Sequence, residues 1–498
     1  MKLLARVEKC RECWFLLCLS VFFFILRIPS LIEPYWYGDE GIYEVIGIAL
    51  RNGRLLYADI WDNKPPLLYA LYAVFSGDQF LVRLASLFFG IASVIIFFFL
   101  AQKVFTHNRL PYVLTTLYAV LFGSPFIEGN IANSENFMQL FILLACFCTV
   151  TLYEKKEQVM QRRNTVLFFS GILLGIAFLF KIVALFDFAA LVVFLLIISA
   201  PAKLQTKKQL FHWIQTSLPH VFSITLGFVI PFGFTAGIFL INGGFMDFLR
   251  ASFIQNVGYV GYKNAFIIPQ GFLILKLLLL TGVVVYLFYK RLHLSPFMLF
   301  VFLWTAFSLF NAFFSQRPYT HYVLVALPSV LLFCGFLATQ YRKHTVLVVA
   351  TFFFLYLLAK QFHYYSVKKT ILYYPNFLSF VTHNKTVSQY QSFFDRDTPR
   401  DYELAGFLRN RLPDNATVFI WGNTAQIYAL SHTLPPGRYT VAYHIGSKEA
   451  IRETQAAIMK KMPTYIVVLP DSTSLPFTLY GYSYTMSIKG TQIYEKNY

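Results

Sequence analysis

Charged residues are scarce in this chain. Only 13% of its 498 residues are charged, whereas a soluble globular protein usually carries about a quarter. Hydrophobic residues make up 57%, phenylalanine alone occurs 56 times, and the mean hydropathy is +0.56. This composition excludes a soluble globular protein and predicts a polytopic membrane protein.

Acidic residues are the scarcer charged type, with 24 Asp and Glu against 42 Lys and Arg, which gives a net charge of +18. In a soluble protein such an excess would suggest a nucleic-acid partner. Here much of the positive charge lies in short links between apolar runs, where it sets membrane topology. We therefore expect no nucleic-acid binding.

Cysteine is also rare. None of the six cysteines lies in the long polar loops or after residue 334, which excludes a disulfide framework there. Cys10 and Cys13 form a single C-x-x-C motif, but the N-terminal tail supplies no second pair of ligands. A zinc site at this motif is therefore not expected.

Apolar runs of about 18 or more residues predict eleven membrane spans. They lie near 14–32, 80–102, 110–126, 132–152, 165–180, 182–200, 218–241, 270–288, 295–313, 320–339 and 345–360. The run from 165 to 200 is broken only by Lys181 and Asp187. Its basic flanks favour two spans, with Lys181 at the outer turn.

The Lys and Arg residues of the links are distributed unevenly. One set of links carries seventeen, and the opposite set carries seven when Lys181 at its span junction is included. The positive-inside rule then places the N-terminus in the cytoplasm. It also places the 33–79 loop, the 242–269 loop, the Arg317 turn and everything after 360 on the outer side.

We expect two domains, a transmembrane domain over 1–360 and a small extracytoplasmic α/β domain over 361–498. In the first outer loop, 33–79, the pattern predicts amphipathic helices at Gly41–Leu50 and Pro65–Phe75.

In the second domain, helices alternate with short strands, which is typical of a small α/β fold. The expected elements are helices over Tyr402–Leu412 and Lys448–Met462 and strands over Ala416–Trp421 and Tyr465–Leu469.

An acidic pair, Asp39 and Glu40, follows directly after the first span in the segment YGDEGIY. Two adjacent carboxylates at a membrane rim are unfavourable without partners, which points to a functional site. They also precede a predicted helix, whose dipole holds anions near its N-terminus. The alternative is an N-cap that simply begins this helix.

A second motif, DNKPP, occupies residues 62–66. It is either a polar turn that leads into a helix with proline in its first turn, or a site in which Lys64 contacts a phosphate or an acidic substrate.

Further polar residues lie at span boundaries on the same predicted outer side. They are Arg83, Glu135, Lys181, Asp187, Arg317, Tyr319, His321 and Tyr322. Each alone is more typical of an interfacial anchor or a snorkelling side chain. Together they would surround one outer cavity with carboxylates and cations, an arrangement that suits an anionic lipid head group.

The order of these motifs resembles a known fold family. The segments YWYGDEGIY, WDNKPPLLYALY and NSENFMQLF look like those of membrane glycosyltransferases of the GT-C fold. The most similar members are the protein O-mannosyltransferase and aminoarabinose transferase superfamily, with its bacterial RgtA/B/C/D-like proteins. The segments GIAFLFKIVAL, QRPYTHYVLVALPSVLL and LRNRLPDNATVFIWG are similar to later parts of these proteins.

The resemblance implies sugar transfer from a polyprenyl-phosphate donor at the outer face, with inversion at the anomeric carbon. The family's catalytic acidic pair corresponds to Asp39 and Glu40, and its phosphate-binding residues correspond to Lys181 and Arg317. The predicted donor-phosphate ligands are Lys181, Arg317, Lys64 and Arg83, and the predicted substrate contacts are Tyr43, Glu135, Tyr319, His321 and Tyr322.

The residue types suit this chemistry. An acceptor hydroxyl has a high pKa, so a carboxylate must take its proton as the new bond forms. A phosphate leaving group needs cations rather than a general acid. We therefore assign Asp39 as the base and Glu40 as its orienting partner or an acceptor contact. A divalent metal beside Asp39 and Glu40 stays open, because an acidic pair alone does not establish one; no other cofactor is expected.

The expected partners are a polyprenyl-phosphate sugar, a glycan, lipid or protein acceptor, and membrane lipids, in a bacterial inner membrane. A transporter or flippase of polyprenyl-linked sugars is the alternative, although that class favours inverted repeats and charges near the midplane. A membrane scaffold is a third hypothesis, but it leaves the acidic pair unexplained.

Overall fold

A computed structural model describes residues 10–105, 109–153, 162–256, 270–315, 317, 319–340 and 367–497. The chain forms two compact units, each assembled from separate stretches of sequence. Unit 1 comprises Met1–Ile28, Ala85–Gly237 and Asn256–Ile371, and unit 2 comprises Pro29–Leu84, Ile238–Gln255 and Leu372–Tyr498. The expected domain boundary between 360 and 361 lies outside the described residues, so the division into 1–360 and 361–498 stays a prediction.

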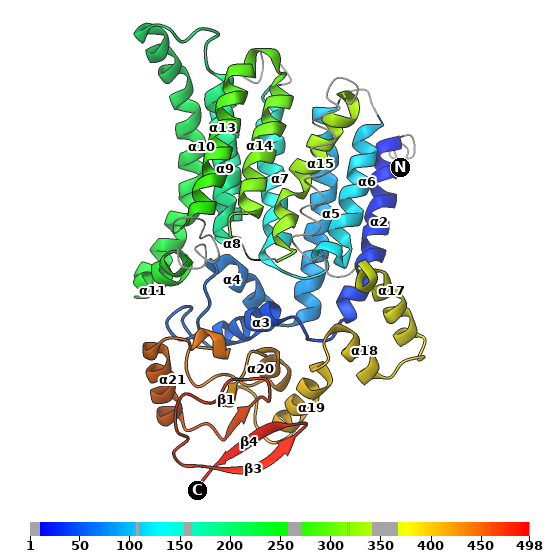
Figure 1. Ribbon diagram of the computed structural model, residues 1–498, viewed down its shortest axis with the longest axis vertical. Coiled ribbons are helices and arrows are strands. Elements are labelled where there is room, and N and C mark those ends of the chain that lie inside the picture. The colour runs from blue at the N-terminus through cyan, green and yellow to red at the C-terminus, as the bar shows by residue number, and fades with distance from the viewer. Residues whose placement is uncertain are drawn as a thin grey trace, which may run out of the picture. The chain divides into compact units, whose positions relative to one another are not determined.

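Long apolar helices make up most of unit 1 (Figure 1). Among the described residues, seven are long and apolar enough to cross a membrane: α2 (Arg11–Ile32), α5 (Gln79–Val104), α7 (Ser134–Thr151), α8 (Arg163–Phe180), α10 (Lys207–Ile241), α13 (Gly271–Lys290) and α15 (Tyr322–Gln340). Three apolar helices are shorter: α6 (Leu110–Gly123), α9 (Leu185–Ile198) and α14 (Pro296–Ala312).

These helices confirm the predicted polytopic, predominantly helical membrane architecture. Ten of the eleven predicted spans coincide with them. The eleventh, at 345–360, lies outside the described residues.

The long apolar run from 165 to 200 forms two helices, as predicted. α8 ends at Phe180, Lys181 has an extended backbone (φ −156°, ψ 130°), and a 3₁₀ turn, η3 (Ile182–Ala184), leads into α9. The Asp187 side chain in α9 is buried and accepts a hydrogen bond from Trp304 Nε1 of α14 at 2.7 Å. This bond joins α9 to α14, since a carboxyl among apolar side chains needs a donor.

Glycines allow helices of unit 1 to pack closely. A Cβ on Gly171 of α8 would lie 2.1 Å from the Ile224 carbonyl of α10, and a Cβ on Gly227 of α10 would lie 2.0 Å from the Phe168 carbonyl. Small residues at such contacts let two backbones approach within a membrane. The α8–α10 contact therefore depends on glycine on both sides.

Unit 2 contains both helices predicted in the first outer loop. They are α3 (Gly38–Arg51) and α4 (Pro66–Val74), which pack on each other. Segment 238–255 adds α11 (Phe245–Leu249) and a π-helical turn, η4 (Arg250–Ile254). A Cβ on Gly41 would lie 2.7 Å from the backbone nitrogen of Gln426, so α20 (Gln426–Ser431) packs directly on the first turns of α3.

The C-terminal part of unit 2 confirms the predicted small α/β fold (Figure 1). Its sheet has the order β1-β2-β4-β3, with β1 (Val418–Trp421) parallel to β2 (Tyr465–Val468). β4 (Thr491–Lys496) pairs antiparallel with both β2 and β3 (Tyr482–Ile488). The predicted helices are α19 (Thr398–Arg409) and α21 (Lys448–Lys461).

Several elements of unit 2 were not predicted. They are α17 (Val367–Val381), α18 (Val387–Phe394), α20, η6 (Ala442–His444), β3 and β4. β3 is exposed along most of its length, so it lacks the alternating apolar pattern by which a half-buried strand is recognised. The core of the sheet contains Phe419, Trp421, Ile458 and Ile466.

Candidate functional site

The acidic pair lies in the first turn of α3. Tyr37 holds the N-cap position with an extended backbone, and no side chain caps the helix. Asp39 and Glu40 therefore follow the N-cap, and the alternative that the pair serves as the N-cap is wrong. Both carboxylates lie where the helix dipole favours negative charge.

Two donors orient the Asp39 carboxylate. Its Oδ2 atom accepts hydrogen bonds from the Tyr43 hydroxyl at 3.0 Å and from the Lys64 ammonium at 3.2 Å. Burial raises the pKa of Tyr43 well above its usual 10.0, so this phenol stays protonated and donates. The Asp39 side chain nevertheless keeps 36% of its surface exposed. It is held in place and remains partly exposed.

Two buried tyrosines fix the backbone of Lys64. The Tyr57 hydroxyl donates to the Lys64 carbonyl at 2.7 Å, and the Lys64 N–H donates to the Tyr69 hydroxyl at 3.2 Å. Pro65 at the N-cap and Pro66 in the first turn of α4 restrict the chain further. The DNKPP motif is thus a polar turn that leads into α4. The same turn fixes the backbone position of Lys64.

Asp62 lies near the same ammonium. Its Oδ2 atom is 3.9 Å from Lys64 Nζ and accepts a hydrogen bond from the Tyr69 hydroxyl at 2.7 Å. Its Oδ1 atom is 3.7 Å from Nε2 of His444, which lies in η6 of the C-terminal segment. Burial, with the Lys64 charge, lowers the pKa of His444 to about 4. His444 is therefore neutral at neutral pH.

Glu40 lies in a different environment from Asp39. Its carboxylate is 1% exposed and forms a bidentate ion pair with Arg83, whose Nε donates to Glu40 Oε1 at 3.0 Å. Arg83 also pairs with Glu33 at 3.0 Å and donates to the Ser30 carbonyl at 2.7 Å. Arg83 is completely buried. Two carboxylates and a carbonyl oxygen therefore already surround this guanidinium, which favours a positioning role over contact with a donor phosphate.

Glu44 is a further buried carboxyl on α3. Neither of its oxygens has a hydrogen-bond partner among the residues that the structure describes. Burial, and secondly the nearby Glu40, raises its pKa well above the usual 4.5. Glu44 therefore holds a proton under conditions in which an exposed glutamate has lost it.

A second charged cluster lies in unit 1, at the break between α8 and α9. The Lys181 ammonium forms an ion pair with Glu135 in the first turn of α7 and lies 4.5 Å from the centre of the Tyr322 ring. Nδ1 of His321 is 2.7 Å from Glu128 Oε2, and its Nε2 is 3.9 Å from Glu135 Oε1. Four predicted site residues thus come together here.

Tyr319 and Arg317 precede this cluster in the turn before α15. The Tyr319 ring stacks on His321 with centroids 5.6 Å apart, and Tyr319 is 41% exposed. Arg317 is half-buried in the same turn. The cluster and the Asp39 site belong to different units, so their placement around one outer cavity stays a prediction.

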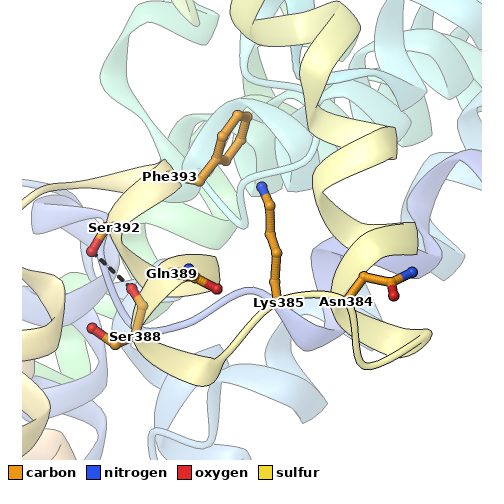
Figure 2. Close-up of a pocket in the computed structure, with 6 residues that line it drawn as sticks. All are labelled: Asn384, Lys385, Ser388, Gln389, Ser392 and Phe393. Atoms are coloured by element: carbon orange, nitrogen blue, oxygen red, sulfur yellow. Dashed lines mark hydrogen bonds between the residues drawn. The ribbon is translucent and has the colours of Figure 1, made fainter.

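A pocket of about 580 Å³ lies beside α18 in unit 2 (Figure 2). Its lining residues are Asn384, Lys385, Ser388, Gln389, Ser392 and Phe393. Figure 2 shows Lys385 extending toward Phe393, and the Lys385 ammonium donates to Asn376 Oδ1 at 2.7 Å. None of the lining residues was predicted as a catalytic or binding residue, and we assign this pocket no part in the function proposed below.

Comparison with known proteins identifies the fold. Residues 55–245 match the family described as dolichyl-phosphate-mannose-protein mannosyltransferase. The chain is similar to the crystal structure of ArnT from Cupriavidus metallidurans bound to undecaprenyl phosphate, with a TM-score of 0.58 and 13% identity over 97% of this chain and 98% of that chain. The chain has the GT-C fold. The resemblance inferred from its motifs is confirmed.

Two other similar structures come from Archaeoglobus fulgidus. One is the oligosaccharyltransferase in the apo form, with a TM-score of 0.47 and 14% identity over 92% of this chain and 70% of that chain. The other is the oligosaccharyltransferase AglB in complex with an inhibitory peptide and a dolichol-phosphate, with a TM-score of 0.48 and 13% identity over 93% of this chain and 69% of that chain. A search of curated proteins finds no significant match.

The residues around Asp39 and Glu40 do not suit a divalent metal. Their carboxylates face different partners, the Lys64 ammonium and the Arg83 guanidinium. No group of three or more His, Cys, Asp or Glu side chains in the described part of the chain is arranged to hold an ion. We therefore derive no catalytic step through a metal at this pair.

Sequence reasoning missed Glu33, Glu128 and His444 as members of these clusters. Glu33 adjoins the first span, so its position beside the acidic motif was a usable signal. Glu128 and His444 offered none, because each contacts residues that are distant in the sequence. Such contacts are set by tertiary packing.

Proposed function

We propose that this protein is an inverting glycosyltransferase. It transfers a sugar from a polyprenyl-phosphate donor to an acceptor hydroxyl at the outer face of the membrane, with Asp39 as general base. The observation that carries the proposal is the Asp39 carboxylate, which Lys64 and Tyr43 orient while about a third of its surface stays open. The GT-C fold and the mannosyltransferase match over residues 55–245 support the reaction class.

The reaction requires one proton transfer and one displacement. The acceptor oxygen attacks the anomeric carbon as Asp39 takes the hydroxyl proton, and the bond from that carbon to the phosphate oxygen breaks. Polyprenyl phosphate leaves with the electron pair. Because attack comes from the face opposite the leaving group, the configuration inverts. A positioned base of this kind typically accelerates such a step by about 10²- to 10⁴-fold.

Cations must stabilise the departing phosphate. We propose Lys64 for this role because its ammonium lies beside the base and its backbone is fixed. We further propose Lys181 and Arg317, with Tyr319, His321 and Tyr322 as substrate contacts. Lys181 already faces the Glu135 carboxylate, an oxyanion that a phosphate oxygen would replace as its partner.

The proposed sidedness follows from the charge distribution of the links. The N-terminus is cytoplasmic and the C-terminal α/β domain is extracytoplasmic, in a bacterial inner membrane. Reporter fusions at the N-terminus and C-terminus are expected to be active on opposite sides. Activity of both fusions on the same side would contradict this topology.

The function is tested by transfer assays on purified protein in detergent. Radiolabelled polyprenyl-phosphate sugars are offered with membrane-extract acceptors to the wild type, to Asp39→Asn and to Asp59→Asn. Asp59 is an exposed carboxylate in the same loop that accepts a hydrogen bond from the Leu55 N–H at 2.8 Å, so its variant is the matched control.

Labelled product is expected with the wild type and with Asp59→Asn, but not with Asp39→Asn. Transfer that survives Asp39→Asn would overturn the assignment of the base. Saturable donor binding without any transfer would instead favour a flippase of polyprenyl-linked sugars.

A further inference from the structure

The Lys64 ammonium lies between two carboxylates of unequal exposure. It is 3.2 Å from Asp39 Oδ2 and 3.9 Å from Asp62 Oδ2. Asp39 is 36% exposed, whereas Asp62 is 4% exposed. The cation therefore has an open partner, the proposed base, and a buried partner to which the proposed function assigns no role.

The buried partner accepts a hydrogen bond at one oxygen and lies near an imidazole at the other. The Tyr69 hydroxyl donates to Asp62 Oδ2 at 2.7 Å, and His444 Nε2 lies 3.7 Å from Asp62 Oδ1. Tyr69 is completely buried, so removal of its hydroxyl would leave Asp62 with less stabilisation and no compensating water. Tyr69 thus fixes the position of Asp62, and His444 lies near its second oxygen.

His444 links the C-terminal segment to this carboxylate. Its ring packs edge-on against Trp61, the neighbour of Asp62, with centroids 4.7 Å apart. Its side chain is 7% exposed, and its Nδ1 atom has no hydrogen-bond partner among the residues that the structure describes. Of these two neighbours, Trp61 is apolar at the contact and the Asp62 carboxylate is the polar one.

We propose that Asp62, held by Tyr69 and His444, is a positioning residue that shares the Lys64 ammonium with Asp39 and so sets how strongly this cation neutralises the catalytic base. This inference rests on the proposed function of Asp39 and Lys64. It gives the C-terminal segment a part in the reaction, through His444, although that segment does not supply the base.

If Asp39 and Asp62 share the Lys64 ammonium, different variants should shift the protonation of Asp39 in opposite directions. In Asp62→Asn the ammonium loses its buried partner and moves closer to Asp39, which disfavours protonation of the base. In Tyr69→Phe and His444→Leu, Asp62 loses a neutral partner and attracts the ammonium away from Asp39. General loss of structure cannot move one kinetic property in two directions.

The test is the acid limb of the kcat–pH profile, measured with a radiolabelled polyprenyl-phosphate sugar that the wild type uses. The limb is expected to move to lower pH in Asp62→Asn and to higher pH in Tyr69→Phe and His444→Leu, each by about 0.5 to 1 pH unit, which corresponds to roughly 1 kcal/mol. Among the residues that the structure describes, the groups facing Asp39 include Lys64 and Tyr43, with Asp62 and His444 beyond Lys64.

A double variant and a control complete the experiment. Because His444 acts through Asp62, Asp62→Asn with His444→Leu should match Asp62→Asn alone rather than the sum of the two. Arg54→Gln is the control. Arg54 follows α3 and donates a hydrogen bond to the Pro435 carbonyl at 2.7 Å, without touching Lys64. Its acid limb should stay at the wild-type pH.

The outcomes are distinguishable. An unmoved limb in Asp62→Asn, or a limb that moves in the same direction in Asp62→Asn and Tyr69→Phe, would overturn this inference while the wild type still transfers sugar. A shift in Arg54→Gln equal to that in His444→Leu would overturn the role of His444 and assign its effect to docking of the segment. Absence of transfer by the wild type would overturn the proposed function and this inference with it.

Discussion

The regions around Asp39 and Glu40 differ in exposure and charge balance, although the two residues are adjacent. Asp39 is part of a partly exposed pair with Lys64, whereas Glu40 is fully buried against Arg83. Successive residues of a helix point about 100° apart, so the first turn of α3 sends one carboxylate toward the Lys64 loop and the other into the packed interior.

The difference separates two uses of an ion pair. A buried pair is a poor source of net stability but becomes strongly destabilising when one partner is removed. A partly exposed pair contributes little to folding, and its carboxylate stays available for chemistry. We therefore expect Glu40 and Arg83 to position α3, and Asp39 to react.

The largest expected effect is on catalysis at the exposed pair. Asp39→Asn should lower kcat by about 10²- to 10⁴-fold, because a phosphate leaving group needs no acid and Asp39 is the proposed proton acceptor. The thermal unfolding temperature in detergent should change little, since asparagine keeps an oxygen for the Tyr43 hydroxyl. A large fall in the unfolding temperature of Asp39→Asn would show that Asp39, like Glu40, mainly supports the fold.

The next effect is on stability at the buried pair. Arg83→Met should destabilise the fold by about 3 to 5 kcal/mol, because it leaves the carboxylates of Glu33 and Glu40 buried without their cation. Thermal and denaturant unfolding in detergent measure this loss. A stable Arg83→Met protein with weak donor binding would instead support the sequence-based prediction that Arg83 contacts the phosphate.

A smaller effect is expected from the third carboxyl of α3, and it depends on pH. The folded state keeps the Glu44 proton above the pH at which the unfolded chain releases it, because burial raises the pKa of this group above 4.5. Its contribution to stability is complete below about pH 4.5 and is lost as pH rises through the folded-state pKa.

Glu44→Gln should remove this dependence. The unfolding temperature of the variant should fall less than that of the wild type between pH 5 and pH 9, with equal kcat at neutral pH. Parallel curves for the two proteins would show that Glu44 is ionised in the folded state.

The smallest effect is expected at a surface pair in the same unit. Lys489 and Glu403 lie 2.7 Å apart but are each about half exposed. Glu403→Gln should change the free energy of unfolding by no more than about 1 kcal/mol, because water already screens both charges. A loss as large as that of Arg83→Met would break the contrast between exposed and buried pairs.

Much of the fold was predictable because its signals are local. Apolar runs predicted ten helices that the structure contains, and the break at Lys181 was expected from basic flanks on both sides. The helices α3 and α4 and the parallel strands β1 and β2 were also expected. β3 was missed because an exposed strand gives a weak periodic signal.

For the candidate site, the sequence predicted which residues take part better than it predicted which of them form ion pairs with each other. The sequence pointed to Asp39, Glu40, Lys64 and the Lys181 region, and the structure brings Asp39 to Lys64 and Lys181 to Glu135. It did not indicate that Arg83 neutralises Glu40 or that His444 approaches Asp62. These pairings join residues from distant parts of the chain.

Hydropathy and motif order are properties of neighbouring residues, so the amino-acid sequence alone identifies a multi-pass membrane protein with an acidic motif after its first span. Which carboxylate is partly exposed and which is buried against a cation becomes visible only in the folded protein. Exposure and charge balance depend on the side chains that packing brings together, and Asp39 and Glu40, one peptide bond apart, have different neighbours.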